Sequence, residues 1–354
     1  MNNSSPLGLF YDKTFYSAHF MDPAIWEPYV RQVCERHGFG SKRIIPGLPG
    51  TFPTFLVEID TDGSQQYSDT IIVKFFGPLF NGVDSFHIEQ SMGYFLAQQS
   101  LSIRSPAILT HGQLTPDWWY LIFEHIPGVS IGQTRQKLSA EAWKGVAHQM
   151  GGYMKALHSV TATILPVIPM SPSVMRWNGF VDFLEKQRAN CYAHHQEWND
   201  LPPHLLEQVQ DFILPADQIL DLSSLPHLIH ADLTADHLFG TLAPTPEMLA
   251  QVPQSPPTAA MGWRTLAIID WGDTRIGNIL YELVALHLDL FQADKLLLRV
   301  CLEAYGLLDF YCQDFPRKAL SMVLLHRFPM PANVYAPHQD ADTLQELAER
   351  LFGV

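Results

Sequence analysis

The stretch LIHADLTADHLFG, residues 228–240, places two histidines and an aspartate within eight residues and flanks them with apolar side chains. His230, Asp232 and His237 fit two chemistries. A metal site uses histidine and carboxylate ligands that converge on one ion. A phosphoryl-transfer loop instead uses a carboxylate beside the attacking hydroxyl and a metal ligand five residues later. The rest of the sequence decides between these two chemistries, and with them the fold.

Composition and charge narrow the class of protein. The 354 residues are enough for two lobes with a sizeable core, and the net charge is −14. This charge argues against a nucleic-acid partner, because neutralising phosphates needs clustered lysine and arginine. It is compatible with a cationic small-molecule substrate. The sequence has neither a signal-peptide pattern nor an apolar run long enough to span a membrane. The four cysteines are scattered, so we expect unpaired, mostly buried thiols in a cytoplasmic protein.

The first third of the chain predicts a small, sheet-rich lobe behind a helical extension. Residues 1–40 contain a helix around PAIWEPYVRQVCERHGF. Two β-prone runs around a Gly/Pro/Thr turn, in residues 43–60, predict a hairpin, and further strands follow in DTIIVKFFG and WWYLIFEHIPG. Helical spacing of apolar residues predicts a helix over 83–99. The sheet-rich lobe therefore covers residues 41–127.

Residues 128–354 predict a larger, mainly helical lobe. The segments 139–160 and 179–198 have helical periodicity, and in the second of these His194 and His195 are expected on a solvated face. The segment 241–262 is rich in proline, alanine and threonine, which predicts an insertion between two strands. After it, RTLAIIDWGDTRIGNILYELVALHLDLF predicts a strand, a turn and a helix.

Three further residues indicate phosphoryl transfer. Lys74 lies in the buried strand IIVKFF and needs a partner for its ammonium group unless the strand is an edge strand facing water. Glu89, in the following helix, could supply that partner, as in kinase-like folds that hold nucleotide phosphates. Asp270 ends the strand LAIID before a glycine turn, where a carboxylate is well placed to bind Mg²⁺. It could also simply initiate the turn.

The order of these features resembles the aminoglycoside phosphotransferase and choline kinase superfamily. The catalytic loop of that family, H-G-D-x-x-x-x-N, is similar to residues 230–237, and its metal-binding segment is similar to IDWGDTRIGNILYELV. The hinge resembles YLIFEHIPG. The resemblance covers about residues 42–290 and implies an α+β, two-lobed protein-kinase-like fold, with a small antiparallel-sheet N-lobe and a larger helical C-lobe.

The resemblance also implies a role for each matched residue. Asp232 would orient or deprotonate the acceptor hydroxyl, and His230 would brace the catalytic loop. Asp270 and His237 would bind Mg²⁺, although His237 stands where the family usually has asparagine. Lys74 and Glu89 would hold the phosphates of ATP or GTP. The backbone from Glu124 to Ile126 would bind the base. Pro49 and Pro53 remove N–H groups from the turn GLPGTFPT, so the Thr51 hydroxyl is expected to help there. Asn278 and Glu282 stand at two positions where the family pattern has acidic residues at the start of a helix. We expect both positions to have structural roles.

The function implied by the resemblance is transfer of a γ-phosphoryl group to a hydroxyl of a small acceptor. Aminoglycoside-, amino-alcohol- and sugar-like acceptors, cationic compounds among them, all remain open. Two alternatives stay open. A catalytically degenerate kinase fold would bind a nucleotide or partner without turnover. An Fe(II) oxygenase would use His230 and Asp232 with a distant histidine, such as His287, on a barrel.

Overall fold

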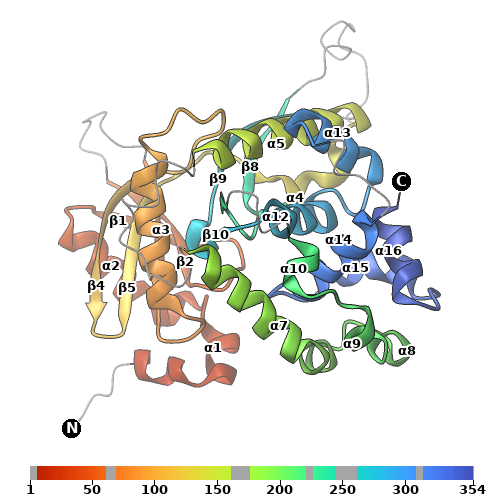
Figure 1. The fold of residues 1–354 in the computed structure, drawn as a ribbon. Coiled ribbons are helices and arrows are strands. Elements are labelled where there is room, and N and C mark those ends of the chain that lie inside the picture. The colour runs from red at the N-terminus through yellow and green to blue at the C-terminus, as the bar shows by residue number, and fades with distance from the viewer. Residues whose placement is uncertain are drawn as a thin grey trace, which may run out of the picture. The chain divides into compact units, whose positions relative to one another are not determined.

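The computed structural model describes residues 6–60, 69–160, 176–220, 226–243, 261–307 and 314–353 (Figure 1). The chain divides into two compact units. The first comprises residues 1–100, 104–127 and 267–273, and the second comprises 101–103, 128–266 and 274–354. The N-terminal segment 1–40 and the much later segment 267–273 therefore both belong to the first unit. Within the described ranges, no helix combines the length and the apolar composition that crossing a bilayer requires.

A five-stranded antiparallel sheet, in the order β1-β2-β3-β5-β4, forms the framework of the first unit. Its strands are β1 (Ser41–Pro46), β2 (Thr54–Ile59), β3 (Thr70–Phe76), β4 (Ile108–Thr115) and β5 (Trp118–Glu124). The predicted hairpin is β1 and β2, in which alternate residues of β2 are buried. Strand β4 was not predicted, because its sequence ILTHGQLT has no apolar alternation and its side chains are half-buried or exposed.

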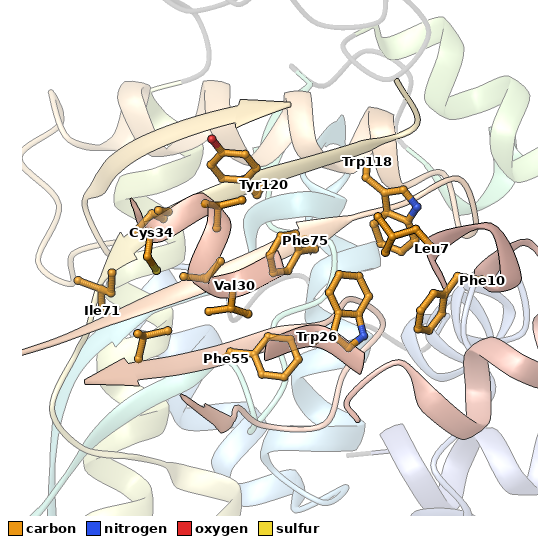
Figure 2. Packing of buried hydrophobic residues seen from close by; sticks show 14 of the residues in the cluster. Leu7, Phe10, Trp26, Val30, Cys34, Phe55, Ile71, Phe75, Trp118 and Tyr120 are labelled. Carbon is orange, nitrogen blue, oxygen red and sulfur yellow. The ribbon is translucent and has the colours of Figure 1, made fainter. Parts of the chain in front are cut away.

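The N-terminal helices form one wall of the core of the first unit. They are η1 (Pro6–Tyr11), α1 (Lys13–His19) and α2 (Pro23–Arg36). Helix α2 begins where the Asp22 side chain accepts a hydrogen bond from the Ala24 N–H and a proline occupies the first helical position. Trp26 is fully buried, with ring centroids 4.8 Å from Phe75 and 5.1 Å from Trp118. Figure 2 shows these aromatic side chains packed between α2 and the strands.

Helix α3 (Gly82–Leu96) packs on β5 and on the short turn η3 (Trp271–Asp273). A Cβ atom at Gly82 would lie 2.2 Å from the Gly77 carbonyl oxygen, so only glycine fits at the first position of the helix. Because α3 packs against η3, residues 82–96 and 271–273, which are far apart in the sequence, lie together in the first unit.

The second unit is mainly helical. Its larger helices are α5 (Ala140–Ser159), α7 (Trp177–Trp198), α12 (Ile279–Ala285), α13 (Lys295–Tyr305), α14 (Phe315–Leu324) and α16 (Leu344–Phe352). Short helical segments are α4 (Ile131–Thr134), η2 (Arg135–Lys137), α8 (Pro203–Leu206), α9 (Val209–Phe212), α10 (Ala216–Ile219), the π-helix η4 (Leu286–Leu290), α15 (Ala332–Tyr335) and η6 (Ala336–His338). The apolar face of α5 is buried at Val146, Ala147, Met150, Met154 and Leu157 and half-buried at Trp143.

Two small sheets position the loop that follows residue 229. Strand β7 (His227–Ile229) pairs antiparallel with β10 (Arg275–Gly277), and β8 (Leu238–Ala243) lies between β6 (Val129–Ser130) and β9 (Gly262–Ile268). The predicted insertion 241–262 lies mostly outside the described residues, with β8 and β9 at its two ends. Asn278 caps α12, because its side chain accepts a hydrogen bond from the Leu280 N–H.

The expected solvated position of His195 on α7 is wrong. His195 is fully buried, with Nδ1 2.8 Å from Asp200 Oδ1 and Nε2 3.0 Å from the Leu324 carbonyl oxygen. Neither partner could be predicted, because the helical pattern of residues 179–198 does not indicate which other segments contact the helix. Cys34, Cys191 and Cys301 are buried and unpaired, as expected, and Cys312 lies outside the described residues.

Candidate phosphoryl-transfer site

A buried charge cluster joins three predicted site residues in the first unit. Lys74 is 6% exposed on β3, and its Nζ atom lies 2.7 Å from Glu89 Oε2 on α3 and 2.8 Å from Asp270 Oδ1. Because β3 is flanked by β2 and β5, the alternative of an edge-strand lysine facing water is wrong. Burial alone would lower the pKa of Lys74, but the two carboxylates raise the pKa above its ordinary value. The lysine is therefore held as an ammonium ion.

Asp270 reaches this cluster because of the backbone around it. The residue has φ of +63°, a left-handed conformation in which a non-glycine residue is strained. The following turn is fixed by a hydrogen bond from Trp271 Nε1 to the Ile268 carbonyl. Gly272 lies against Ser85 and Glu89 of α3. The Asp270 side chain is 35% exposed, so its carboxylate is anchored on one side and reaches solvent on the other.

The histidine and aspartate loop lies in the second unit, between β7 and β8. His230 is fully buried, and its Nδ1 atom accepts a hydrogen bond from the Asp232 N–H at 3.3 Å. Ala231, between them, has φ of +68° and is also buried. The family pattern has glycine at this position, which adopts such a backbone without strain. His230 thus lies beneath the loop, in a position that suits a bracing role.

His237 folds back onto the same loop. Its Nδ1 atom lies 2.6 Å from the Asp232 carbonyl oxygen and 3.1 Å from Thr234 Oγ1. A carbonyl oxygen can only accept, so Nδ1 carries the hydrogen and Nε2 carries the lone pair. A backbone carbonyl that orients an imidazole in this way is the usual support for a metal-ligating histidine.

Two acidic residues support the loop, and the sequence did not reveal what they contact. Glu282 of α12 is fully buried, and its Oε2 atom accepts a hydrogen bond from the His230 N–H at 2.7 Å. Asp289, in the π-helix, accepts from the Ala235 N–H at 2.6 Å. Arg135 holds that π-helix through the carbonyls of Asp289 and Leu290. A glutamate in a run of apolar helical residues was the available signal for Glu282; the sequence favoured a solvated face for Asp289 and did not indicate its contact with Ala235.

The remaining predicted nucleotide contacts lie in the first unit. Thr51 is exposed in the turn between β1 and β2, and its carbonyl accepts a hydrogen bond from the Tyr16 hydroxyl. Glu124 ends β5; its carboxylate accepts from the Ala107 N–H and pairs with Arg104 at 2.8 Å. Ile126 is buried just beyond β5. The carboxylate of Glu124 therefore contacts neighbouring residues of the protein. The prediction for this segment concerns its backbone, which is expected to bind the nucleotide base.

The distant histidine of the oxygenase alternative is hydrogen-bonded to the protein backbone. His287 is fully buried, and its Nε2 atom donates to the Leu351 carbonyl at 3.0 Å. In the part of the chain that the structure describes, no group of three or more His, Cys, Asp or Glu side chains could hold a metal ion. A site completed by nucleotide phosphates needs only one or two protein ligands.

Comparisons with known proteins identify the fold. The fold is similar to the GDP complex of wild-type aminoglycoside 2'-phosphotransferase-IIIa, with a TM-score of 0.59 and 16% identity over 92% of this chain and 96% of the other. For the GDP and kanamycin complex of APH(2")-IIia, the TM-score is 0.60 and the identity 17% over 92% and 97%. These likenesses show a kinase-like α+β fold with an antiparallel-sheet part and a helical part.

A curated relative is much longer than this chain. Lysine-specific demethylase JMJ21 of Arabidopsis thaliana is 25% identical over an alignment of 230 residues; the match covers 57% of this chain and 23% of the relative. The chain therefore spans about a quarter of that protein's length, and the demethylase name describes the longer protein.

The sequence itself also matches a family model. The model of the phosphotransferase enzyme family covers residues 49–246, more than half of the chain. The matched region includes Lys74, Glu89 and the loop from His230 to His237. This chain belongs to the phosphotransferase enzyme family.

Proposed function

We propose that this protein is a small-molecule kinase that transfers the γ-phosphoryl group of ATP or GTP to a hydroxyl of a small acceptor. The observation that carries the proposal is the buried cluster of Lys74, Glu89 and Asp270 in a chain of the phosphotransferase family. A buried ammonium ion between two carboxylates is costly to assemble. Binding of nucleotide phosphates by Lys74 and of a cation by Asp270 would give this arrangement a function.

In this proposal the first unit binds the nucleotide. Lys74 contacts its phosphates and Glu89 holds Lys74 in place, while Thr51 and the backbone from Glu124 to Ile126 contact the phosphates and the base. In the second unit, Asp232 orients the acceptor hydroxyl and takes its proton, and His230 and Glu282 fix the backbone around Asp232. Phosphoryl transfer needs little more than such positioning and charge neutralisation.

The residues present fit Mg²⁺ as the accompanying cation. Asp270 offers a partly exposed carboxylate, and the hydrogen bond at Nδ1 of His237 leaves the lone pair on Nε2. Carboxylates are preferred Mg²⁺ ligands, and imidazole is a weaker one. We therefore propose Asp270 as the main protein ligand and His237 as a second ligand. When bound, Mg²⁺ would neutralise phosphate charge.

Release of ADP or GDP, measured with a panel of hydroxyl compounds and with MgATP or MgGTP, tests the proposal. Asp232→Asn keeps the shape of the side chain and removes its charge, so turnover should fall by about 10²-fold or more. Nucleotide affinity, measured by calorimetry, should change little. Nucleotide binding without acceptor-dependent turnover would favour the binding-only alternative. A response to Fe²⁺ and 2-oxoglutarate in place of nucleotide would favour the oxygenase.

A further inference from the structure

Helix α1, in the N-terminal segment, contacts the turn between β1 and β2; these elements can be followed in Figure 1. The Tyr16 hydroxyl lies 2.7 Å from the Thr51 carbonyl oxygen and donates to it, because a carbonyl oxygen only accepts. The Thr54 N–H donates to the sulfur of Met21, just beyond α1, at 3.4 Å. Two side chains that lie 35 and 33 residues earlier in the sequence therefore hold this turn.

The surroundings of Tyr16 suit it to hold the turn in one place. Its side chain is 3% exposed, and burial raises the pKa of its hydroxyl, which therefore keeps its proton at physiological pH. Its ring makes a T-shaped contact with Phe10, at a centroid distance of 5.8 Å, and stacks on Phe20 at 5.6 Å. Because these contacts fix the ring, the hydroxyl donates in one direction, and α1 determines where the Thr51 carbonyl lies.

Further hydrogen bonds of the turn act at its ends. The Gly47 N–H donates to the Thr54 carbonyl at 2.7 Å, and the Phe75 N–H, on β3, donates to the Pro53 carbonyl at 2.9 Å. Thr51 lies between these ends and is exposed. The contact with Tyr16 therefore constrains the middle of the turn, which contains the residue that the proposed function assigns to the nucleotide phosphates.

The turn also places a ring beside the Lys74 ammonium group. Phe52, next to Thr51, is 8% exposed, and its ring centroid lies 5.8 Å from Lys74 Nζ. The same ring packs on Phe76, with centroids 5.1 Å apart, and the Phe76 centroid lies 5.2 Å from Lys74 Nζ. A displacement of the turn would therefore change the surroundings of the ammonium group that is proposed to contact the phosphates.

The Tyr16 ring contacts a second segment that leads to Lys74. It makes a T-shaped contact with Phe80, at a centroid distance of 5.3 Å. Phe80 and Asn81, directly before α3, have φ of +56° and +55°, a left-handed conformation that is strained in non-glycine residues and needs support from its surroundings. Helix α3 carries Glu89, which pairs with Lys74. Tyr16 thus contacts the turn through its hydroxyl and the residues that begin α3 through its ring.

We propose that Tyr16 is a positioning residue for the nucleotide: α1 holds the turn of residues 47–54 in the conformation that receives the phosphates. This inference rests on the proposed kinase function and gives the N-terminal segment a part in it. When only a fraction of the molecules is in the binding conformation, the apparent affinity falls in proportion to that fraction. Loss of one hydrogen bond of ordinary strength lowers such a fraction by about three- to tenfold.

Tyr16→Phe tests this role, because it keeps the ring and removes only the donor. Thr51 is exposed, so water can bond to its carbonyl, and we expect the variant to fold. Calorimetry should show a rise of about three- to tenfold in the Kd for MgATP or MgGTP. The Kd for the corresponding nucleoside, adenosine or guanosine, should change less than about twofold, because a nucleoside has no phosphate. A purely structural role would not weaken the binding of phosphates selectively.

Steady-state kinetics and hydrogen exchange provide independent measurements. The KM for the nucleotide should rise by the same factor as its Kd, whereas kcat should change less than about twofold, because saturating nucleotide restores the binding conformation. Amide hydrogen exchange of residues 47–54 should be faster in Tyr16→Phe, and that of β3 should be unchanged.

Two other variants complete the experiment. Tyr11→Phe is the matched control: it removes a hydroxyl from the same N-terminal region, but this hydroxyl bonds to the Asp117 side chain, so nucleotide binding should not change. Met21→Leu removes the second contact with the turn and keeps a similar volume. The rise in nucleotide Kd should be smaller, about twofold, because a thioether is a weak acceptor. This variant provides the same comparison if Tyr16→Phe does not fold.

The outcomes distinguish this inference from the kinase proposal. An equal nucleotide Kd in the wild-type protein and the folded variants, or an equal loss of affinity for nucleotide and nucleoside, would overturn the role of Tyr16 while the kinase proposal stands. Nucleotide binding that depends on Tyr16, without turnover of any acceptor, would support the positioning role and remove the kinase function. A wild-type protein that binds neither MgATP nor MgGTP would overturn both.

Discussion

At the scale of single residues, His237 shows how a hydrogen bond selects a chemical role. Its Nδ1 atom donates a hydrogen bond to the Asp232 carbonyl, so in the neutral imidazole the lone pair lies on Nε2. Because imidazole is a poorer Mg²⁺ ligand than an amide or carboxylate oxygen, any contribution of His237 to metal binding should be modest and visible mainly at low metal concentration.

We therefore expect the Mg²⁺ requirement to differ among variants at this position. His237→Asn supplies an oxygen ligand of similar reach and should keep activity at an equal or lower Mg²⁺ concentration. His237→Ala should lose about tenfold in activity at low Mg²⁺ and recover in part at high Mg²⁺. Initial rates measured across a Mg²⁺ titration check this. Identical titration curves for all three proteins would remove His237 from the metal site.

Site residues could be predicted where a charged side chain stood out in an otherwise apolar strand or helix. A lysine in an apolar strand and a glutamate in the next helix predicted the pair Lys74 and Glu89, and the structure brings them to 2.7 Å. The support that Asp289 gives to Ala235 was not predictable, because it depends on a π-helix that local sequence does not reveal. His195 was misplaced for a similar reason: its partner at Leu324 is 129 residues away.

At the scale of elements, α2 is part of the core of the first unit and not an appendage. Its Trp26 is surrounded by rings from η1, β2, β3 and β5 (Figure 2). The sequence predicted this helix, and in the structure an N-cap aspartate and a proline mark its start. That the helix packs on the sheet could not be predicted, since periodicity indicates a buried face without identifying what covers it.

Trp26→Ala should therefore destabilise the protein by about 3–5 kcal/mol, the usual cost of removing a large buried aromatic side chain. Leu9→Ala is the matched control in the same N-terminal region; Leu9 is 55% exposed, so its truncation should cost less than about 0.5 kcal/mol. Urea denaturation followed by tryptophan fluorescence and circular dichroism measures both. Similar unfolding midpoints for the two variants would show that α2 contributes little to the core.

At the scale of the whole molecule, buried neutral histidines should make the fold sensitive to acid. Burial lowers the pKa of His287 to about 4, from an ordinary value of 6.5. As the pH falls, the unfolded chain takes up this proton first. The stabilising contribution is therefore complete above about pH 6.5 and is lost progressively down to about pH 4.

This difference predicts that His287 alone contributes a loss of about 1 kcal/mol in the free energy of unfolding between pH 7 and pH 5.5. His287→Gln keeps a donor for the Leu351 carbonyl without a titrating group, so its free energy of unfolding should fall less over the same interval, by about that amount. Urea titrations at the two pH values provide the comparison. An unchanged loss in the variant would show that His287 does not contribute to acid sensitivity.

The contact between Lys74 and Asp270, 2.8 Å long, implies a thermodynamic coupling between the two proposed ligands of the first unit. A nucleotide phosphate that takes Lys74 leaves the Asp270 carboxylate without its counter-charge, and a divalent cation restores it. Linkage then requires each ligand to raise the affinity of the other by one common factor. Calorimetry should find the nucleotide bound at least about tenfold more tightly with Mg²⁺ than with EDTA. Asp270→Asn should bring the two affinities closer together, and equal affinities in the wild-type protein would show that the two ligands bind independently.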